Sequence, residues 1–227
     1  MTHPVIRPAP PQQFGGAANT YTLAAGTVLS RVHEVAYPAT SFKPIPADVV
    51  FGGGRFDSTQ LDVYDYLYAG ETDAGAVAEA LLRDIDANDQ GYRFLPKKFW
   101  TGRRLSRVRT TVDVQLVTLR TGVDLGAIGA GTWLVDCDVD EYPQSRAWGH
   151  WIRSISGSSA GFAWLSKREP GTTAYVLFED RCPPGLLVHE PGPLAGGSSF
   201  DDADGGTWLR NHLAKYRVSI RRAQTDT

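Results

Sequence analysis

The chain has little sulfur chemistry. Only Cys137 and Cys182 occur among its 227 residues, and neither lies in a Cys-x-x-Cys or Cys-His spacing. A disulfide scaffold and a thiolate metal site are therefore not predicted. The five histidines lie far apart and form no i, i+4 ligand pair. We predict two reduced cysteines in or near the core and no metal ion.

A long apolar run and a dominant charge are also missing. No stretch approaches the roughly 18 apolar residues of a membrane span, and residues 1–16 lack the apolar segment of a signal peptide. Lys and Arg total 23 against 25 for Asp and Glu, a net charge of -2. This balance disfavours nucleic acid and anionic membranes as partners, although Lys97-Lys98 and Arg103-Arg104 leave a local basic patch open. We expect a cytoplasmic protein.

The composition favours one domain. Hydrophobic residues make up 42% of the chain, enough for a core at this length. Residues 1–22 are rich in Pro, Gln, Gly and Asn without an apolar period, which predicts a flexible N-terminal arm. The folded domain is expected over 23–227, including a C-terminal extension.

Hydrophobic periodicity predicts a fold of class α+β. Helices are expected at 73–85, with Thr72 as N-cap, and at 145–156. Strands are expected at 27–35, 162–165, 174–178 and 216–220. An extended segment is expected to end at Tyr68, and residues 106–119 are expected to form one long strand. Strands and helices do not alternate regularly, so a doubly wound parallel sheet is not expected. Residues 191–206 read as a surface loop.

Two arginines are candidate anion ligands. Arg55 follows three glycines, which let backbone approach a ligand, and a guanidinium offers a planar fork to phosphate oxygens. The alternative is a hairpin turn with an exposed arginine. Arg31 interrupts an otherwise apolar strand, where an edge or surface position is the competing interpretation.

An aromatic pair and a carboxylate complete the candidates from the first half of the chain. Tyr66 and Tyr68 project from one face of their strand and could stack on a planar ring or simply fill the core. Glu79 lies on a helix among small and apolar residues, where a carboxylate is partly desolvated. Its competing interpretation is a surface pair with Arg83, four residues later.

Ser166 ends the apolar strand around Gly161-Phe162-Ala163-Trp164-Leu165. No Gly-x-Ser-x-Gly surrounds it and no Ser, His and acid order suggests a hydrolase triad. A nucleophile is therefore disfavoured, and a hydroxyl that binds a polar ligand group is the functional interpretation.

The order of these segments resembles the RES-domain family, the toxin component of many bacterial toxin-antitoxin pairs. The resemblance covers roughly residues 29–181. It runs through the following segments: Leu29-Ser30-Arg31, the Gly-Arg-Phe turn at Arg55, the segment at Tyr68, the Ala-x-Ala-Glu helix at Glu79, the helix entry at 142–151, and Gly161 to Ser166 followed by Val176-Leu177-Phe178.

The resemblance implies a fold and a chemistry. The fold would be similar to ADP-ribosyltransferases, with a mixed or antiparallel β core and flanking helices. NAD would be the substrate, with no prosthetic cofactor, and its nicotinamide-ribose bond would be broken by water or inorganic phosphate. Arg31 and Arg55 would grip the pyrophosphate, Tyr68 would stack on nicotinamide, Glu79 would stabilise the ribose cation, and Ser166 would hold the ribose. Whether Tyr66 or Tyr68 stacks is open.

Alternatives and partners also follow from the resemblance. The same site could transfer ADP-ribose to a macromolecule, and a non-catalytic nucleotide-binding module is the alternative outside the enzymes. A helix-turn-helix antitoxin is the partner that the family implies. A predicted C-terminal helix with Trp208, Leu209 and Leu213 could serve packing or a homodimer.

Overall fold

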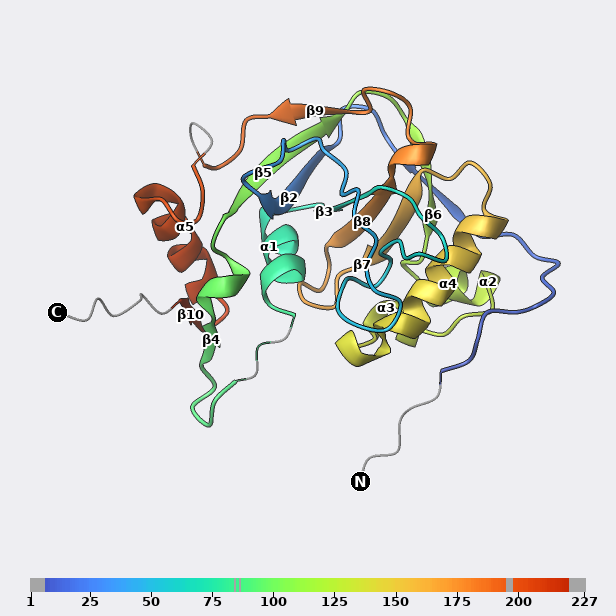
Figure 1. Ribbon diagram of the computed structural model, residues 1–227, viewed down its shortest axis with the longest axis horizontal. Helices are drawn as coiled ribbons and strands as arrows, with labels where there is room; N and C mark the ends of the chain where they lie inside the picture. Colours follow the sequence, from blue (N-terminus) through green and yellow to red (C-terminus); the bar gives the residue numbers. More distant parts are fainter. Residues whose placement is uncertain (1–6, 84, 86, 195–197, 221–227) are drawn as a thin grey trace.

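The computed structural model describes residues 7–83, 85, 87–194 and 198–220. Its centre is an eight-stranded sheet in the order β1-β6-β7-β8-β3-β2-β5-β9 (Figure 1). Neighbouring strands are antiparallel except β6 and β7, which are parallel. The strands are β1 Thr20–Leu23, β2 Val28–Glu34, β3 Tyr66–Gly70, β5 Arg103–Thr110, β6 Val114–Thr118, β7 Gly161–Leu165, β8 Thr173–Phe178 and β9 Leu187–Glu190.

The helices form two groups along this sheet. In Figure 1, α2, α3 and α4 gather on one side of the view, and α1 and α5 lie on the other, beside a separate parallel pair of β4 and β10. These elements are α1 Asp73–Leu81, α2 Gly122–Ala127, α3 Trp133–Asp136, α4 Tyr142–Ile155, α5 Ala203–Ala214, β4 Arg93–Leu95 and β10 Val218–Ile220. The predicted α+β class, with a mostly antiparallel sheet and flanking helices, is confirmed.

The core divides over the two faces of the sheet. On one face α4 packs Trp148 and Ile152 against buried strand residues such as Phe162. On the other face the strands bury residues such as Leu67 and Leu177. Tyr66 and Tyr68 belong to the first cluster and Leu67 to the second, as the predicted alternation requires. A third cluster joins α1 to α5.

Helix α1 begins as predicted and ends early. The Thr72 hydroxyl accepts a hydrogen bond from the Gly75 amide at 3.0 Å, and Asp73 lies in the first turn. The helix ends at Leu81 rather than at residue 85. The sequence after Arg83 is Asp-Ile-Asp-Ala-Asn, and Asp and Asn compete for backbone hydrogen bonds and disfavour helix.

The predicted long strand over 106–119 is wrong. Two strands occupy it, and they lie far apart in the sheet, β5 beside β2 and β6 beside β1. Between them the chain turns where the Asp113 carboxylate accepts a hydrogen bond from the Ala25 amide at 2.7 Å. The Thr111 amide donates to the Leu186 carbonyl in the same region. Neither Gly nor Pro marks this turn, so the apolar alternation gave no sign of it.

Other expected boundaries hold with small shifts. The expected strands at 27–35, 162–165 and 174–178 correspond to β2, β7 and β8, and the expected helix at 145–156 to α4. The predicted loop over 191–206 extends too far, because α5 begins at Ala203. Gly205 is buried there, and a side chain on it would collide with the Ser199 carbonyl.

The described part of the expected N-terminal arm lies along the domain. The Trp148 indole donates a hydrogen bond to the Pro8 carbonyl at 2.8 Å, and Phe14 packs edge-on against Trp151. The boundary expected at residue 22 falls inside β1, which pairs with β6. No helix within the described residues has the length and apolar character to cross a membrane.

Candidate active site

A cavity of about 160 Å³ lies where α1 meets strands β2, β3 and β5. It brings together four of the five predicted site residues, which come from three strands or loops and one helix. The lining residues are Arg31, Val32, Arg55, Tyr68, Ala69, Ala76, Glu79, Ala80, Arg83, Arg103, Tyr142, Trp164 and Ala174. Ser166 does not line the cavity but contacts a residue that does.

Arg55 is a buried residue that lines this cavity rather than an exposed residue. Its Nη2 donates to the Cys137 carbonyl at 3.2 Å and its Nε to the Cys137 sulfur at 3.4 Å. Its guanidinium lies 5.5 Å from the centre of the Tyr142 ring. The Ser145 hydroxyl donates to the Arg55 backbone carbonyl at 3.0 Å. The alternative of an exposed arginine at this turn is therefore excluded.

The glycine turn before Arg55 is closely packed. Gly53 has φ +75, a conformation that glycine adopts without strain. A Cβ on Gly54 would lie 2.5 Å from Asp57 Oδ1 and 3.0 Å from the Tyr68 hydroxyl. Asp57 is buried, and its Oδ2 accepts from the Gly54 amide at 2.8 Å. Arg146, also buried, donates to carbonyls of the same turn and fixes it from the other side.

Arg31 is buried in β2 without a carboxylate partner among the described residues. Its Nη1 donates to the carbonyls of Ala39 at 2.7 Å and Ser41 at 2.8 Å. Its Nε is buried and finds no hydrogen-bond partner in the described chain. Burial lowers the pKa of Arg31 to about 10, so the cation still persists at neutral pH.

Tyr68, rather than Tyr66, faces the cavity. Its hydroxyl accepts a hydrogen bond from the Phe56 amide at 2.9 Å, and its ring lies edge-on to Trp164. Tyr66 is only 2% exposed and belongs to the core. The geometry thus favours Tyr68 as the ring available to a ligand in this cavity.

Glu79 and Ser166 form one unit. The Ser166 hydroxyl donates to Glu79 Oε1 at 2.6 Å and accepts from the amides of Arg168 at 3.2 Å and Glu169 at 2.9 Å. Arg83 donates its Nε to the Glu79 backbone carbonyl at 2.9 Å, and no ion pair joins the two side chains. Glu79 is therefore fixed by Ser166 rather than paired on the surface with Arg83.

Two further arginines line the cavity, and the sequence did not single them out as ligands. The sequence indicates Arg83 only as a partner of Glu79, and Arg103 only as part of a local basic patch. Arg103 begins β5 and lies opposite Glu34 of β2, the strand that also carries Arg31. The i, i+4 spacing from Glu79 was the signal that could have placed Arg83 at the site. Burial lowers the pKa of Arg103, the Glu34 carboxylate opposes this shift, and the neighbouring Arg83 adds to it.

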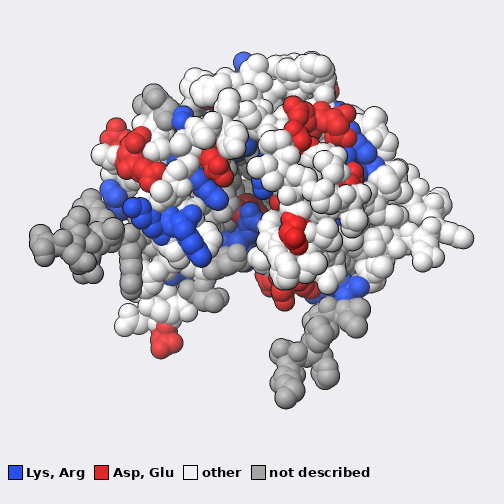
Figure 2. Space-filling view, in the orientation of Figure 1, with Lys and Arg blue, Asp and Glu red and all other residues white. Residues whose placement is uncertain are grey.

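The cavity is consequently cationic. Four guanidinium groups face one carboxylate, and none of the four makes an ion pair with a described carboxylate. Figure 2 shows this face of the molecule hollowed near its middle, with Lys and Arg side chains at the hollow. Such a site attracts and holds an anion. In the part of the chain that the structure describes, no group of His, Cys, Asp and Glu is arranged to hold a metal ion.

Comparison with known proteins identifies the family. A model of the RES domain matches residues 28–203, most of the chain. The chain belongs to the RES domain family. Arg31, Arg55, Tyr68, Glu79 and Ser166 all lie within the matched RES domain. Much of the N-terminal segment and the greater part of α5 lie outside it.

One solved structure is similar in fold to this RES domain. It is the crystal structure of the M. tuberculosis MbcT-MbcA toxin-antitoxin complex, at 15% sequence identity and a TM-score of 0.49. The match covers 75% of this chain and 84% of that chain. Comparison with curated proteins found no match.

Proposed function

We propose that this RES domain cleaves the bond between nicotinamide and ribose in NAD. The observation that carries the proposal is the position of one carboxylate, Glu79, held by a hydrogen bond at the wall of a cavity with four arginines. The diphosphate of a dinucleotide supplies the anion that such arginines bind. Family membership supports the same substrate.

The proposed reaction uses the chain's own groups in distinct roles. As the glycosidic bond breaks, positive charge develops on the ribose, and the fixed Glu79 carboxylate stabilises it. The bonding electrons leave with nicotinamide, which departs as a neutral ring. Tyr68 offers its ring to the nicotinamide, and Arg31 and Arg55 hold the phosphates. An oxygen of water or inorganic phosphate then bonds to the same ribose carbon, and the acceptor releases a proton to solvent.

The test is nicotinamide release from NAD by the purified protein. Glu79→Gln keeps the shape and removes the charge, and we expect it to lower kcat by about 100-fold or more. Glu190→Gln is the matched control, because Glu190 lies at the surface in an ion pair with Arg109. Near-normal turnover by a folded Glu79→Gln protein would refute the assigned mechanism. Comparing buffers with and without inorganic phosphate identifies the acceptor.

An experiment with labelled NAD separates the alternative activities. Labelled NAD incubated with lysate leaves label on macromolecules if the protein is a transferase, and only small labelled products if it is a hydrolase or phosphorylase. Absence of nicotinamide release with NAD still bound would indicate a non-catalytic module.

We also propose that the protein acts as a toxin, on the ground of its family. Expression alone should deplete cellular NAD and arrest growth, and the Glu79→Gln protein should not. Co-expression of a neighbouring helix-turn-helix gene should relieve the arrest. Normal growth on expression would contradict the toxin role, and growth arrest with normal NAD levels would contradict NAD depletion as its cause.

A further inference from the structure

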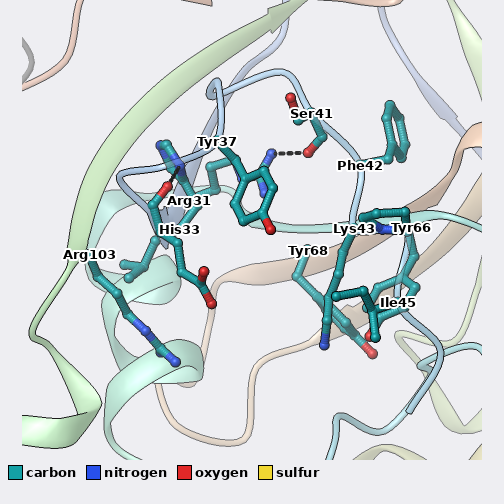
Figure 3. A pocket seen from close by; sticks show the side chains of 13 residues that line it. Arg31, His33, Tyr37, Ser41, Phe42, Lys43, Ile45, Tyr66, Tyr68 and Arg103 are labelled. Atoms are coloured by element: carbon teal, nitrogen blue, oxygen red, sulfur yellow. Dashed lines mark hydrogen bonds between the residues drawn. The ribbon is translucent and has the colours of Figure 1, made fainter.

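A second cavity adjoins the candidate active site. It has a volume of about 260 Å³, against about 160 Å³ for the first, and Figure 3 shows the side chains that line it. Both cavities are lined by Arg31, Val32, Tyr68 and Arg103. Neither reaches the roughly 300 Å³ of a typical small-molecule pocket, but the two together exceed it. We propose that the second cavity binds the adenosine half of NAD, with Arg103 holding the diphosphate together with Arg31 and Arg55 where the two cavities meet. This proposal rests on the proposed function.

The shared wall has two incompletely paired cations. The Arg31 Nε is buried and unpartnered among described groups, although Nη1 is fixed by two carbonyls. Among the described residues, the Arg103 side chain makes no ion pair within 4 Å, and Glu34 is the carboxylate that acts on it from farther away. A diphosphate at this wall would give both guanidinium groups acceptor oxygens. It would also leave one half of the dinucleotide in each cavity.

The outer part of the second cavity suits a planar base and a sugar. Tyr37, Phe42 and Ile45 line it, and Tyr37 and Ile45 remain 47% and 59% exposed. Figure 3 shows the Tyr37 ring at the cavity, beside the bond from Arg31 to Ser41. Aromatic faces of this kind stack on bases. Glu34 also lines the cavity and offers a carboxylate that can accept hydrogen bonds from ribose hydroxyls.

The smaller cavity is the one that holds the reacting groups. Glu79, Arg55 and Tyr142 line it and do not line the larger one. The two ends of the ligand therefore meet different side chains. A change in the larger cavity should weaken binding of the adenosine half and leave the chemistry at Glu79 intact.

The test compares Tyr37→Ala with Tyr92→Ala. Both tyrosines are 47% exposed, and Tyr92 lines neither of the two cavities. We expect Tyr37→Ala to raise KM for NAD by about 5- to 100-fold with kcat little changed, because a stacking contact is lost. The kcat/KM for nicotinamide mononucleotide, which lacks adenosine, should be unaffected. Tyr92→Ala should match the wild type on both substrates.

A second pair of variants tests the diphosphate position. Arg103→Ala should raise KM for NAD by roughly 10- to 100-fold, as expected for loss of a hydrogen bond between charged groups. The neighbouring Arg104 donates to the Val35 carbonyl and lines neither cavity, so Arg104→Ala is the control. Unchanged KM values for NAD in both Tyr37→Ala and Arg103→Ala, with normal turnover, would overturn the inference and leave the proposed function standing.

Binding of ADP-ribose, measured by calorimetry, needs no turnover. Loss of ADP-ribose affinity in Tyr37→Ala supports the inference even in a protein that releases no nicotinamide. Failure of the wild type to bind ADP-ribose, or equal affinity in the wild type, Tyr37→Ala and Arg103→Ala, would refute it.

Discussion

The hydrogen bond from Ser166 to Glu79 gives a sharp prediction about catalysis. Ser166→Ala removes a hydroxyl that is 4% exposed and lies 2.6 Å from Glu79 Oε1. A hydrogen bond to a charged group contributes about 1.5–3 kcal/mol. If the bond fixes the carboxylate for the developing ribose cation, its loss should lower kcat by roughly 10- to 100-fold.

Loss of the hydroxyl also has a cost in stability. The amides of Arg168 and Glu169 lose their acceptor, and both residues are half-buried, so water can partly replace it. We expect a decrease of about 1 kcal/mol in the free energy of unfolding, measured in urea. Ser154→Ala is the control, because the exposed Ser154 hydroxyl donates only to the Trp151 carbonyl of its own helix.

A double-mutant cycle separates the two effects. In the Glu79→Gln background the carboxylate is already absent, so Ser166→Ala should change kcat by much less than in the wild type. The assay is nicotinamide release with saturating NAD, on proteins whose folding is verified first. An equal fold-loss in both backgrounds would refute the claim that Ser166 acts through Glu79.

Two further predictions concern the turn before Arg55 and the pH dependence of stability. Gly54→Ala should lower the free energy of unfolding by about 1–3 kcal/mol in a urea titration and reduce nicotinamide release, because the new Cβ would collide with Asp57 and Tyr68. Gly126→Ala is the control: it lies in α2 with open space around the new Cβ and should not destabilise the protein. Burial, reinforced by nearby arginines, lowers the pKa of His33 to about 4 from an ordinary value of 6.5. Between these values the unfolded chain binds a proton at His33 that the folded protein does not. Urea titrations should therefore show the free energy of unfolding falling as pH drops from about 6.5 to 4, and His33→Gln should reduce this dependence. An unchanged pH dependence in His33→Gln would contradict the assignment to His33.

The sequence predicted elements whose signals are local. The N-cap at Thr72 and the apolar period after it located the start of α1, and the spacing of Trp148, Trp151, Ile152 and Ile155 located α4. The turn between β5 and β6 was not predicted. It depends on Asp113 reaching the Ala25 amide, a contact across 88 positions that no local pattern encodes.

The site shows the same division. Arg31, Arg55, Tyr68 and Glu79 could be named from residue type and order, and the structure gathers them at one cavity. A role for Ser166 in holding the ribose stays a prediction, and its hydroxyl also donates a hydrogen bond to Glu79, which the sequence did not indicate. Residues far apart in sequence meet only after the sheet is ordered β8-β3-β2-β5, with α1 packed on it.

The buried cations at this cavity lower the stability of the empty protein. Arg31 is 9% exposed, is opposed by no described carboxylate and keeps an unpartnered Nε, so its burial costs free energy in the absence of a ligand. Arg83 and Arg103 add further cations around the one carboxylate. The negative charge of a bound diphosphate would offset the repulsion among these arginines. An anion that binds only the folded state also raises the free energy of unfolding, by an amount that grows with the logarithm of its concentration over Kd. In the proposed function, the arginines would contribute to ligand affinity what they cost the empty protein in stability.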